Sequence, residues 1–237
     1  MPNNDFDIDS LAAYLHLSPQ QVMRMADRGK LPGRKLGGQW RFAEAEIHHW
    51  LEERIGVSDD VELSQVEGVL ARSDRGNVDQ VAAIHELLQP AAIEIPLPAR
   101  TRNSVIEQMS RLAESTGLLW DADRMAEALR AREELHPTAL GNGVALLHPR
   151  RPQAAILAEA FLAFGRTSQG IPFGGGRGGL TQVFFLICST NDREHLRILA
   201  RLSRLLTDAS VVAALHDAED ATEVRQMIAD AEGRFEN

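Results

Sequence analysis

Two short apolar runs limit what this chain can fold into. Residues 144–147 (VALL) are all apolar, residues 181–189 (TQVFFLICS) contain the continuous apolar run 183–188, and both segments have the length of a buried strand. Gly141 and Gly143 precede the first run and allow a positive φ or a close backbone approach there. Helical periodicity marks the segments around them, at residues 101–118, 121–133 and 191–208. Strands mixed with helices in this way predict a sheet covered by helices on both faces.

Composition divides the chain into three parts. We expect a small, mostly helical domain at residues 1–56, and a polar linker with weak helical periodicity at 57–78. The α/β pattern fills residues 79–237, where we expect a three-layer α/β/α domain with a mixed sheet. One apolar segment within it, residues 154–164 (AAILAEAFLAF), fits a strand or a helix, and periodicity alone does not decide between them.

Charge and apolar content exclude several classes of protein. No apolar run is long enough to cross a bilayer, and the first ten residues are acidic and polar, unlike a secretory signal. The single cysteine, Cys188, cannot form an intrachain disulfide and lies in an apolar run, which favours core packing. We therefore expect a cytoplasmic protein with no membrane insertion. The net charge is −9, yet residues 24–41 are strongly basic, which indicates either a solvated face or a contact for a polyanion.

The order of elements in residues 1–56 is typical of a winged helix-turn-helix. A short helix at residues 9–17 precedes Ser18-Pro19, an N-cap followed by proline at the first helical position. The second helix ends at Gly29, and Gly37-Gly38 marks a two-residue hairpin. A third helix is expected at residues 43–56.

A helix of this kind lies in a major groove, with its N-terminal side chains at base edges. Base contacts are expected from Gln20, Gln21 and Arg24, phosphate contacts from Arg28, Lys30, Arg34 and Lys35, and a minor-groove contact from Arg41. The alternative is a small protein-interaction domain whose basic face is only solvated.

The same region resembles the excisionase-type helix-turn-helix module, which is related to the MerR group. The matching positions are Leu11 to Ser18, Val22 to Met25, Arg28 to Pro32, Leu36 to Phe42, and Trp50-Leu51. The resemblance covers the whole first domain and implies binding to double-stranded DNA.

His148 is the best-placed of the eight histidines for chemistry. It follows the apolar run 144–147, so its backbone is expected to be fixed at the end of a strand, with Arg150 and Arg151 directly after it. A neutral imidazole is a nucleophile at neutral pH, and nearby guanidinium groups stabilise phosphoryl oxygens. This pattern suits phosphoryl transfer to nitrogen, although a lone histidine is more often a packing residue.

The C-terminal region resembles the type 2 enzyme IIA domain of the bacterial phosphoenolpyruvate-dependent sugar phosphotransferase system, over roughly residues 79–234. The matching positions, in order, are Arg132-Glu133, Thr138, Gly141 to Leu146, His148, and His195 at the start of HLRILARLSRLL. The resemblance implies that His148 is phosphorylated and that His195 orients it. Arg132, Thr138, Asn142 and Arg150 are further candidates for the site. No metal and no cofactor is expected beyond a transient covalent phosphate on His148.

The chain departs from the family pattern around the site. Leu147 stands where the family has proline, Pro149 follows the histidine, and a glycine-rich loop at residues 174–179 is expected near the site. The leading hypothesis is a DNA-binding regulator whose phosphorylation state is set by a histidine phosphocarrier protein. Two alternatives stay open: a non-catalytic sensor that binds a small anion or a protein partner, and a sugar-system component whose helix-turn-helix docks proteins. Further expected partners are a sugar-permease component, another regulated protein, or a second copy in a homodimer.

Overall fold

The computed structural model describes residues 5–15, 17–44, 46–47, 50–51, 82–174 and 179–235. The chain forms two compact units, Met1–Asp79 and Gln80–Asn237. The linker expected at 57–78 and much of the helix expected at 43–56 lie outside the described residues.

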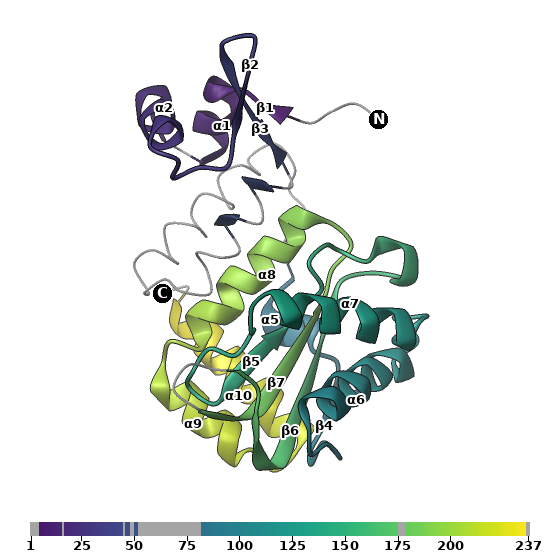
Figure 1. The fold of residues 1–237 in the computed structure, drawn as a ribbon. Helices are drawn as coiled ribbons and strands as arrows, with labels where there is room; N and C mark the ends of the chain where they lie inside the picture. Colours follow the sequence, from purple (N-terminus) through teal and green to yellow (C-terminus); the bar gives the residue numbers. More distant parts are fainter. Residues whose placement is uncertain are drawn as a thin grey trace. The chain divides into compact units, whose positions relative to one another are not determined.

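The first unit is a winged helix-turn-helix. Helices α1 (Ile8–Leu15) and α2 (Pro19–Asp27) pack together, and β1 (Asp5–Phe6), β3 (Gln39–Ala43) and β2 (Arg34–Leu36) form a small antiparallel sheet in that order (Figure 1). Its core includes Leu11, Val22 and Phe42, which are fully buried.

Local signals set the boundaries of these elements as the sequence predicts. The Ser18 side chain accepts from the Gln21 backbone N–H at 3.2 Å, and Gln21 Oε1 accepts from the Ser18 N–H at 2.8 Å, which is a capping box at the start of α2. Gly37 and Gly38 have φ of 58° and 82°, as a two-residue hairpin of this type requires.

The second unit is built on a four-stranded mixed sheet of order β4-β6-β7-β5. Strand β6 (Phe161–Pro172) pairs antiparallel with β7 (Leu180–Cys188) and parallel with β4 (Ile93–Glu94), and β5 (Val144–Leu147) pairs parallel with β7. The ambiguous segment 154–164 divides into a 3-10 turn, Ala154–Ile156, and the start of β6.

Helices cover both faces of this sheet, so the mixed three-layer prediction is confirmed. Helices α6 (Arg102–Ser115) and α7 (Ala122–Leu135) lie on one face (Figure 1). The other face is covered by the remaining helices: α8 (Asp192–Leu205), α9 (Ala209–Asp217), α10 (Ala221–Phe235) and the short α5 (Ile84–Leu87).

Alternation along the strands decides which face each side chain meets. Ala145, Leu147, Phe184 and Leu186 pack with residues of α6 and α7 in one apolar cluster. Because successive strand residues point to opposite faces, the residues between them point toward α8. His148 and Ser189, one residue beyond the ends of β5 and β7, share this second orientation.

Candidate functional site

The candidate site lies where two parallel strands end beside the start of a helix. Leu147 of β5 is in register with Leu186 of β7, so the residues that follow the two strands meet at the same edge of the sheet. His148 follows β5 there, and His195 lies in the first turn of α8. The two imidazole rings have their centroids 5.3 Å apart with an interplanar angle of 55°. The structure therefore brings together the two histidines that the sequence singles out.

The ring of His148 is fixed by a hydrogen bond to its own strand. Nδ1 lies 2.7 Å from the Leu146 carbonyl oxygen. Because a carbonyl oxygen can only accept, Nδ1 carries the proton, and the lone pair of the neutral ring is on Nε2. His148 is buried, with 4% of its surface exposed. The site thus presents a rigid imidazole with a defined tautomer and one nucleophilic nitrogen.

A serine that the sequence reading did not select holds the second histidine. Ser189 Oγ lies 3.1 Å from His195 Nδ1, and Ser189 is fully buried. The Ser189 carbonyl also accepts from the Gln153 N–H at 3.2 Å, which joins it to the segment after His148. The signal that could have found this residue is its position. It is the first polar residue after the buried strand β7, as His148 is after β5.

The Thr138 segment is anchored beside β5 by a buried carboxylate. The Thr138 carbonyl accepts from the Leu146 N–H at 3.1 Å, which places this segment beside the end of β5. Glu133 Oε1 accepts from the Thr138 backbone N–H at 3.0 Å and from its hydroxyl, and Glu133 Oε2 pairs with Arg102 at 3.1 Å. Arg132 is buried, and its Nη1 donates to the His136 carbonyl at 2.7 Å at the end of α7.

Two other candidates lie elsewhere. Asn142 is at the opposite end of β5 from His148. There its Nδ2 donates to the Leu206 carbonyl at 3.1 Å, and its Oδ1 accepts from the Val144 N–H at 3.3 Å. Its geometry is that of a turn residue. Arg150 is exposed two positions after His148. The positive φ expected before β5 is confirmed, with 81° at Gly141 and 88° at Gly143.

The glycine-rich loop connects the two strands of the β6–β7 hairpin, and its first residue, Gly174, lies against Pro137, next to the Thr138 segment. Its flanks, Pro172 and Leu180, pair with each other at the start of β7. That end of β7 lies next to Gly143, whose carbonyl accepts from the Gln182 N–H at 3.0 Å. A shift in register between Arg166 and Ile171 shapes this hairpin, a feature that short-range sequence patterns do not reveal. Residues 175–178 lie outside the described part of the chain.

The basic face of the first unit divides into free and engaged cations. Arg24, Arg28 and Lys30 are exposed and form no ion pair with another described residue. The other cations are paired: Arg34 with Asp5 at 3.1 Å, Lys35 with Asp27 at 3.5 Å, and Arg41 with Asp7 at 3.6 Å. Gln20 is exposed at the start of α2, whereas the Gln21 side chain is held in the capping box, so it cannot read a base without breaking that bond.

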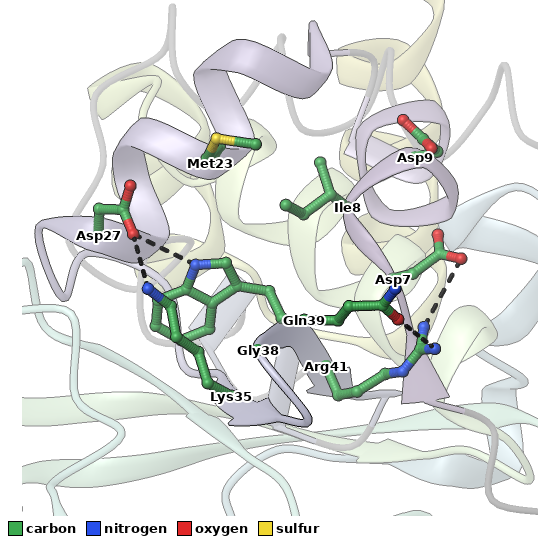
Figure 2. Close-up of a pocket in the computed structure, with 10 residues that line it drawn as sticks. Asp7, Ile8, Asp9, Met23, Asp27, Lys35, Gly38, Gln39 and Arg41 are labelled. Carbon is green, nitrogen blue, oxygen red and sulfur yellow. Dashed lines mark hydrogen bonds and ion pairs between the residues drawn. The ribbon is translucent and has the colours of Figure 1, made fainter.

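A pocket of about 440 Å³ lies between α2 and the hairpin in this unit (Figure 2). One oxygen of Asp27 receives both the Trp40 indole N–H at 3.3 Å and the Lys35 ammonium, whose nitrogen lies 4.9 Å from the Trp40 ring centroid. Hydrogen bonds from Ser10 hold the pKa of Asp7 below its usual value, so this carboxylate stays ionised. Asp9 adds a third carboxylate to the lining, which therefore disfavours a phosphate.

Among the described residues, no group of three His, Cys, Asp or Glu side chains is arranged to hold a metal ion. None of the described helices is long and apolar enough to cross a membrane.

The chain thus combines a helix-turn-helix unit with a mixed α/β domain that carries a strand-end histidine pair. Residues 86–231 match the family described as the phosphoenolpyruvate-dependent sugar phosphotransferase system, EIIA 2, and the chain belongs to that family. Residues 6–55 match a helix-turn-helix domain.

Curated relatives match the second unit. A nitrogen regulatory protein of Bradyrhizobium diazoefficiens is 33% identical over 150 residues, which cover 62% of this chain and 94% of that protein. A fructose-specific EIIABC component of the phosphotransferase system from Bacillus subtilis is 29% identical over 147 residues. That match covers 61% of this chain but only 23% of the Bacillus protein, so the chain spans about a quarter of its length.

Solved structures agree with the fold. The nitrogen regulatory protein IIA-Ntr from Neisseria meningitidis is 28% identical, with a TM-score of 0.56 over 61% of this chain and 98% of that one. IIA mannitol from Escherichia coli is 22% identical, with a TM-score of 0.53 over 59% and 97% of the two chains, and shows the shared fold.

Proposed function

We propose that the second unit accepts a phosphoryl group on His148 Nε2, that the first unit binds double-stranded DNA, and that phosphorylation changes DNA occupancy. The observation that carries this proposal is the 2.7 Å hydrogen bond from His148 Nδ1 to the Leu146 carbonyl, because it leaves the lone pair on Nε2 of a ring whose centroid lies 5.3 Å from that of His195. Membership of the EIIA 2 family supports the same histidine, which ends the GNGVALLH motif.

The donor is a small histidine phosphocarrier protein. The His148 Nε2 lone pair attacks the phosphorus, the P–N bond of the donor breaks, and a new P–N bond forms while the donor imidazole keeps the released electron pair. The Nδ1 proton stays on His148, donated to Leu146 throughout. No cofactor or metal takes part in this step.

The product differs from the starting protein chiefly in charge. A dianionic phosphoryl group on a ring that keeps its Nδ1 proton changes the charge of the site by about −1, and at a buried position such a charge acts on its neighbours with little screening. The nearly full-length match to a nitrogen regulatory protein supports a regulatory output, whereas the fructose-specific relative is matched over a quarter of its length. A homodimer on paired DNA sites fits this output, and analytical ultracentrifugation on duplexes with one or two sites tests it.

One observation favours a second candidate function. With 4% of its surface exposed, His148 offers a macromolecular donor a very small target. The second candidate is a DNA-binding sensor whose EIIA unit binds a small anion or a protein partner and is not phosphorylated.

Intact mass spectrometry separates the two candidates. The full chain is incubated with phosphoenolpyruvate, the general phosphotransferase enzyme and the carrier protein, and its mass is compared with that of His148→Ala. We expect one phosphoryl group on the wild type and none on the variant. The matched control is His216→Ala, a half-buried histidine beside Gly143 at the other end of β5, which should still be labelled. An unlabelled wild type would exclude the phosphoryl proposal and leave the sensor.

Duplex binding measured against salt concentration tests the DNA half. Each phosphate contact contributes about −0.9 to the slope of log affinity against log salt concentration. Replacing Arg24, Arg28 and Lys30 with alanine should weaken binding and reduce the steepness of that slope. A wild-type slope near zero contradicts DNA binding and favours protein docking. The same titration with phosphorylated wild-type protein and with His148→Ala tests whether the two halves are coupled.

A further inference from the structure

We infer that Ser189 is a positioning residue which keeps His195 as the neutral tautomer with its proton on Nε2. The inference rests on the proposed phosphorylation of His148, and it names the Ser189 hydroxyl as the group that sets the tautomer of the neighbouring His195. Three facts about Ser189 carry it: its complete burial, its 3.1 Å contact with His195 Nδ1, and its place at the strand end shared with His148.

The direction of the Ser189 hydrogen bond decides what His195 can do. If the hydroxyl donates to Nδ1, the ring proton is on Nε2, and His195 can donate to an oxygen of a phosphoryl group on His148. If the hydroxyl accepts from Nδ1, a neutral His195 presents a lone pair from Nε2, which repels an anionic oxygen. Only the first arrangement stabilises the product, since a phosphoryl oxygen needs donors.

The surroundings of His195 favour the same arrangement. His195 is a buried residue in the first turn of α8. A neutral ring then has one proton to place, and the buried hydroxyl of Ser189 needs an acceptor for its own proton. His195 Nδ1 at 3.1 Å is such an acceptor. The Ser189 carbonyl is already used as the acceptor for Gln153, so this residue links the segments of both histidines.

Two readouts test the inference, and one of them does not depend on phosphorylation. The ¹⁵N chemical shifts of the His195 ring report its tautomer in the unphosphorylated protein. We expect the Nε2–H tautomer in the wild type and a mixture in Ser189→Ala. The second readout is the lifetime of the phosphohistidine, which should shorten by roughly 2- to 10-fold in the variant, the effect of losing one net hydrogen bond.

Ser203→Ala is the matched control. Ser203 is a buried serine on α8, the helix that carries His195, and its hydroxyl has no hydrogen-bond partner among the described residues. Removing its hydroxyl should change neither the His195 shifts nor the phosphoryl lifetime. An Nδ1–H tautomer in the wild type, or unchanged His195 shifts in Ser189→Ala, overturns the inference. A wild type that shows the Nε2–H tautomer but takes up no phosphate refutes the proposed function alone.

Discussion

Glu133 is a buried carboxylate with three donors, and its removal is the sharpest test of how the site is built. Only 2% of its side chain is exposed. It accepts from the Thr138 N–H, from the Thr138 hydroxyl and from Arg102. Hydrogen bonds to charged groups contribute about 1.5–3 kcal/mol each, and breaking a buried charged pair costs about 3–5 kcal/mol. The Arg102 side chain is 36% exposed and regains water when the partner is lost. We therefore expect Glu133→Ala to lower the unfolding free energy of the second unit by about 3–5 kcal/mol.

A urea titration that is monitored by the ¹⁹F resonances of fluorotryptophan measures the loss of unfolding free energy in the second unit separately from the first. Trp120 is the single tryptophan of residues 80–237, so its resonance reports the second unit while those of Trp40 and Trp50 report the first. Glu134→Ala is the matched control, because its side chain is exposed and should change stability by no more than about 0.5 kcal/mol. A Glu133→Ala midpoint close to that of the control would refute the anchoring argument.

Three further predictions concern groups outside this anchor. Asp27→Asn keeps an acceptor for Trp40 but frees the Lys35 charge, so duplex affinity and the steepness of its salt dependence should rise. Unchanged anisotropy titrations would contradict this prediction. Burial raises the pKa of the Cys188 thiol, so iodoacetamide should modify it in urea but not in native protein, as intact mass would show. Burial also raises the pKa of Glu94, so its ionisation reduces stability as pH rises through the folded pKa. In thermal melts, Glu94→Gln should therefore raise the stability of the second unit at neutral pH, and this gain should disappear below the ordinary pKa of 4.5. An equal gain in stability at low pH would contradict burial of the charged carboxylate as the cause.

Short-range sequence patterns predict most helices and strands of this fold. They fail for segments whose secondary structure is set by strand pairing with residues far away in the sequence. The capping of α2, the glycines before β5 and the buried strand β7 all follow from neighbouring residues. The structure of residues 154–164 does not follow from neighbouring residues. Strand β6 begins at Phe161 because the backbone there pairs with Cys188 of β7. The capping role of Gln21 was also not predicted, although its N3 position after Ser18 is the signal for it; its contact with a base stays a prediction.

The histidine pair was predicted, but the contacts that Ser189 and Glu133 make were not, for a related reason. His148 and His195 are found through motifs that lie within a few residues of each one. Ser189 and Glu133 form hydrogen bonds to residues that are close in sequence. Those hydrogen bonds belong to the site only because β5 and β7 end at the same edge of the sheet. That edge is a property of the register between strands about 40 residues apart. A search for polar residues that directly follow apolar, parallel-strand candidates would recover Ser189 from sequence.

Burial and reactivity make opposite demands on His148, and the local structure reconciles them. A dry environment protects a P–N bond from hydrolysis, whereas transfer needs access to one nitrogen. The segment that follows, residues 149–153, begins with proline, which has no N–H to pair. In the described part of the unit, two backbone hydrogen bonds join Gln153 to residues outside this segment: its N–H donates to the Ser189 carbonyl at 3.2 Å, and its carbonyl accepts from the Ile156 N–H at 3.0 Å. Each contributes about 1 kcal/mol, far less than the cost of disrupting β5. We therefore expect a donor to reach His148 more easily by displacing this segment than by disturbing the strand or the Leu146 contact.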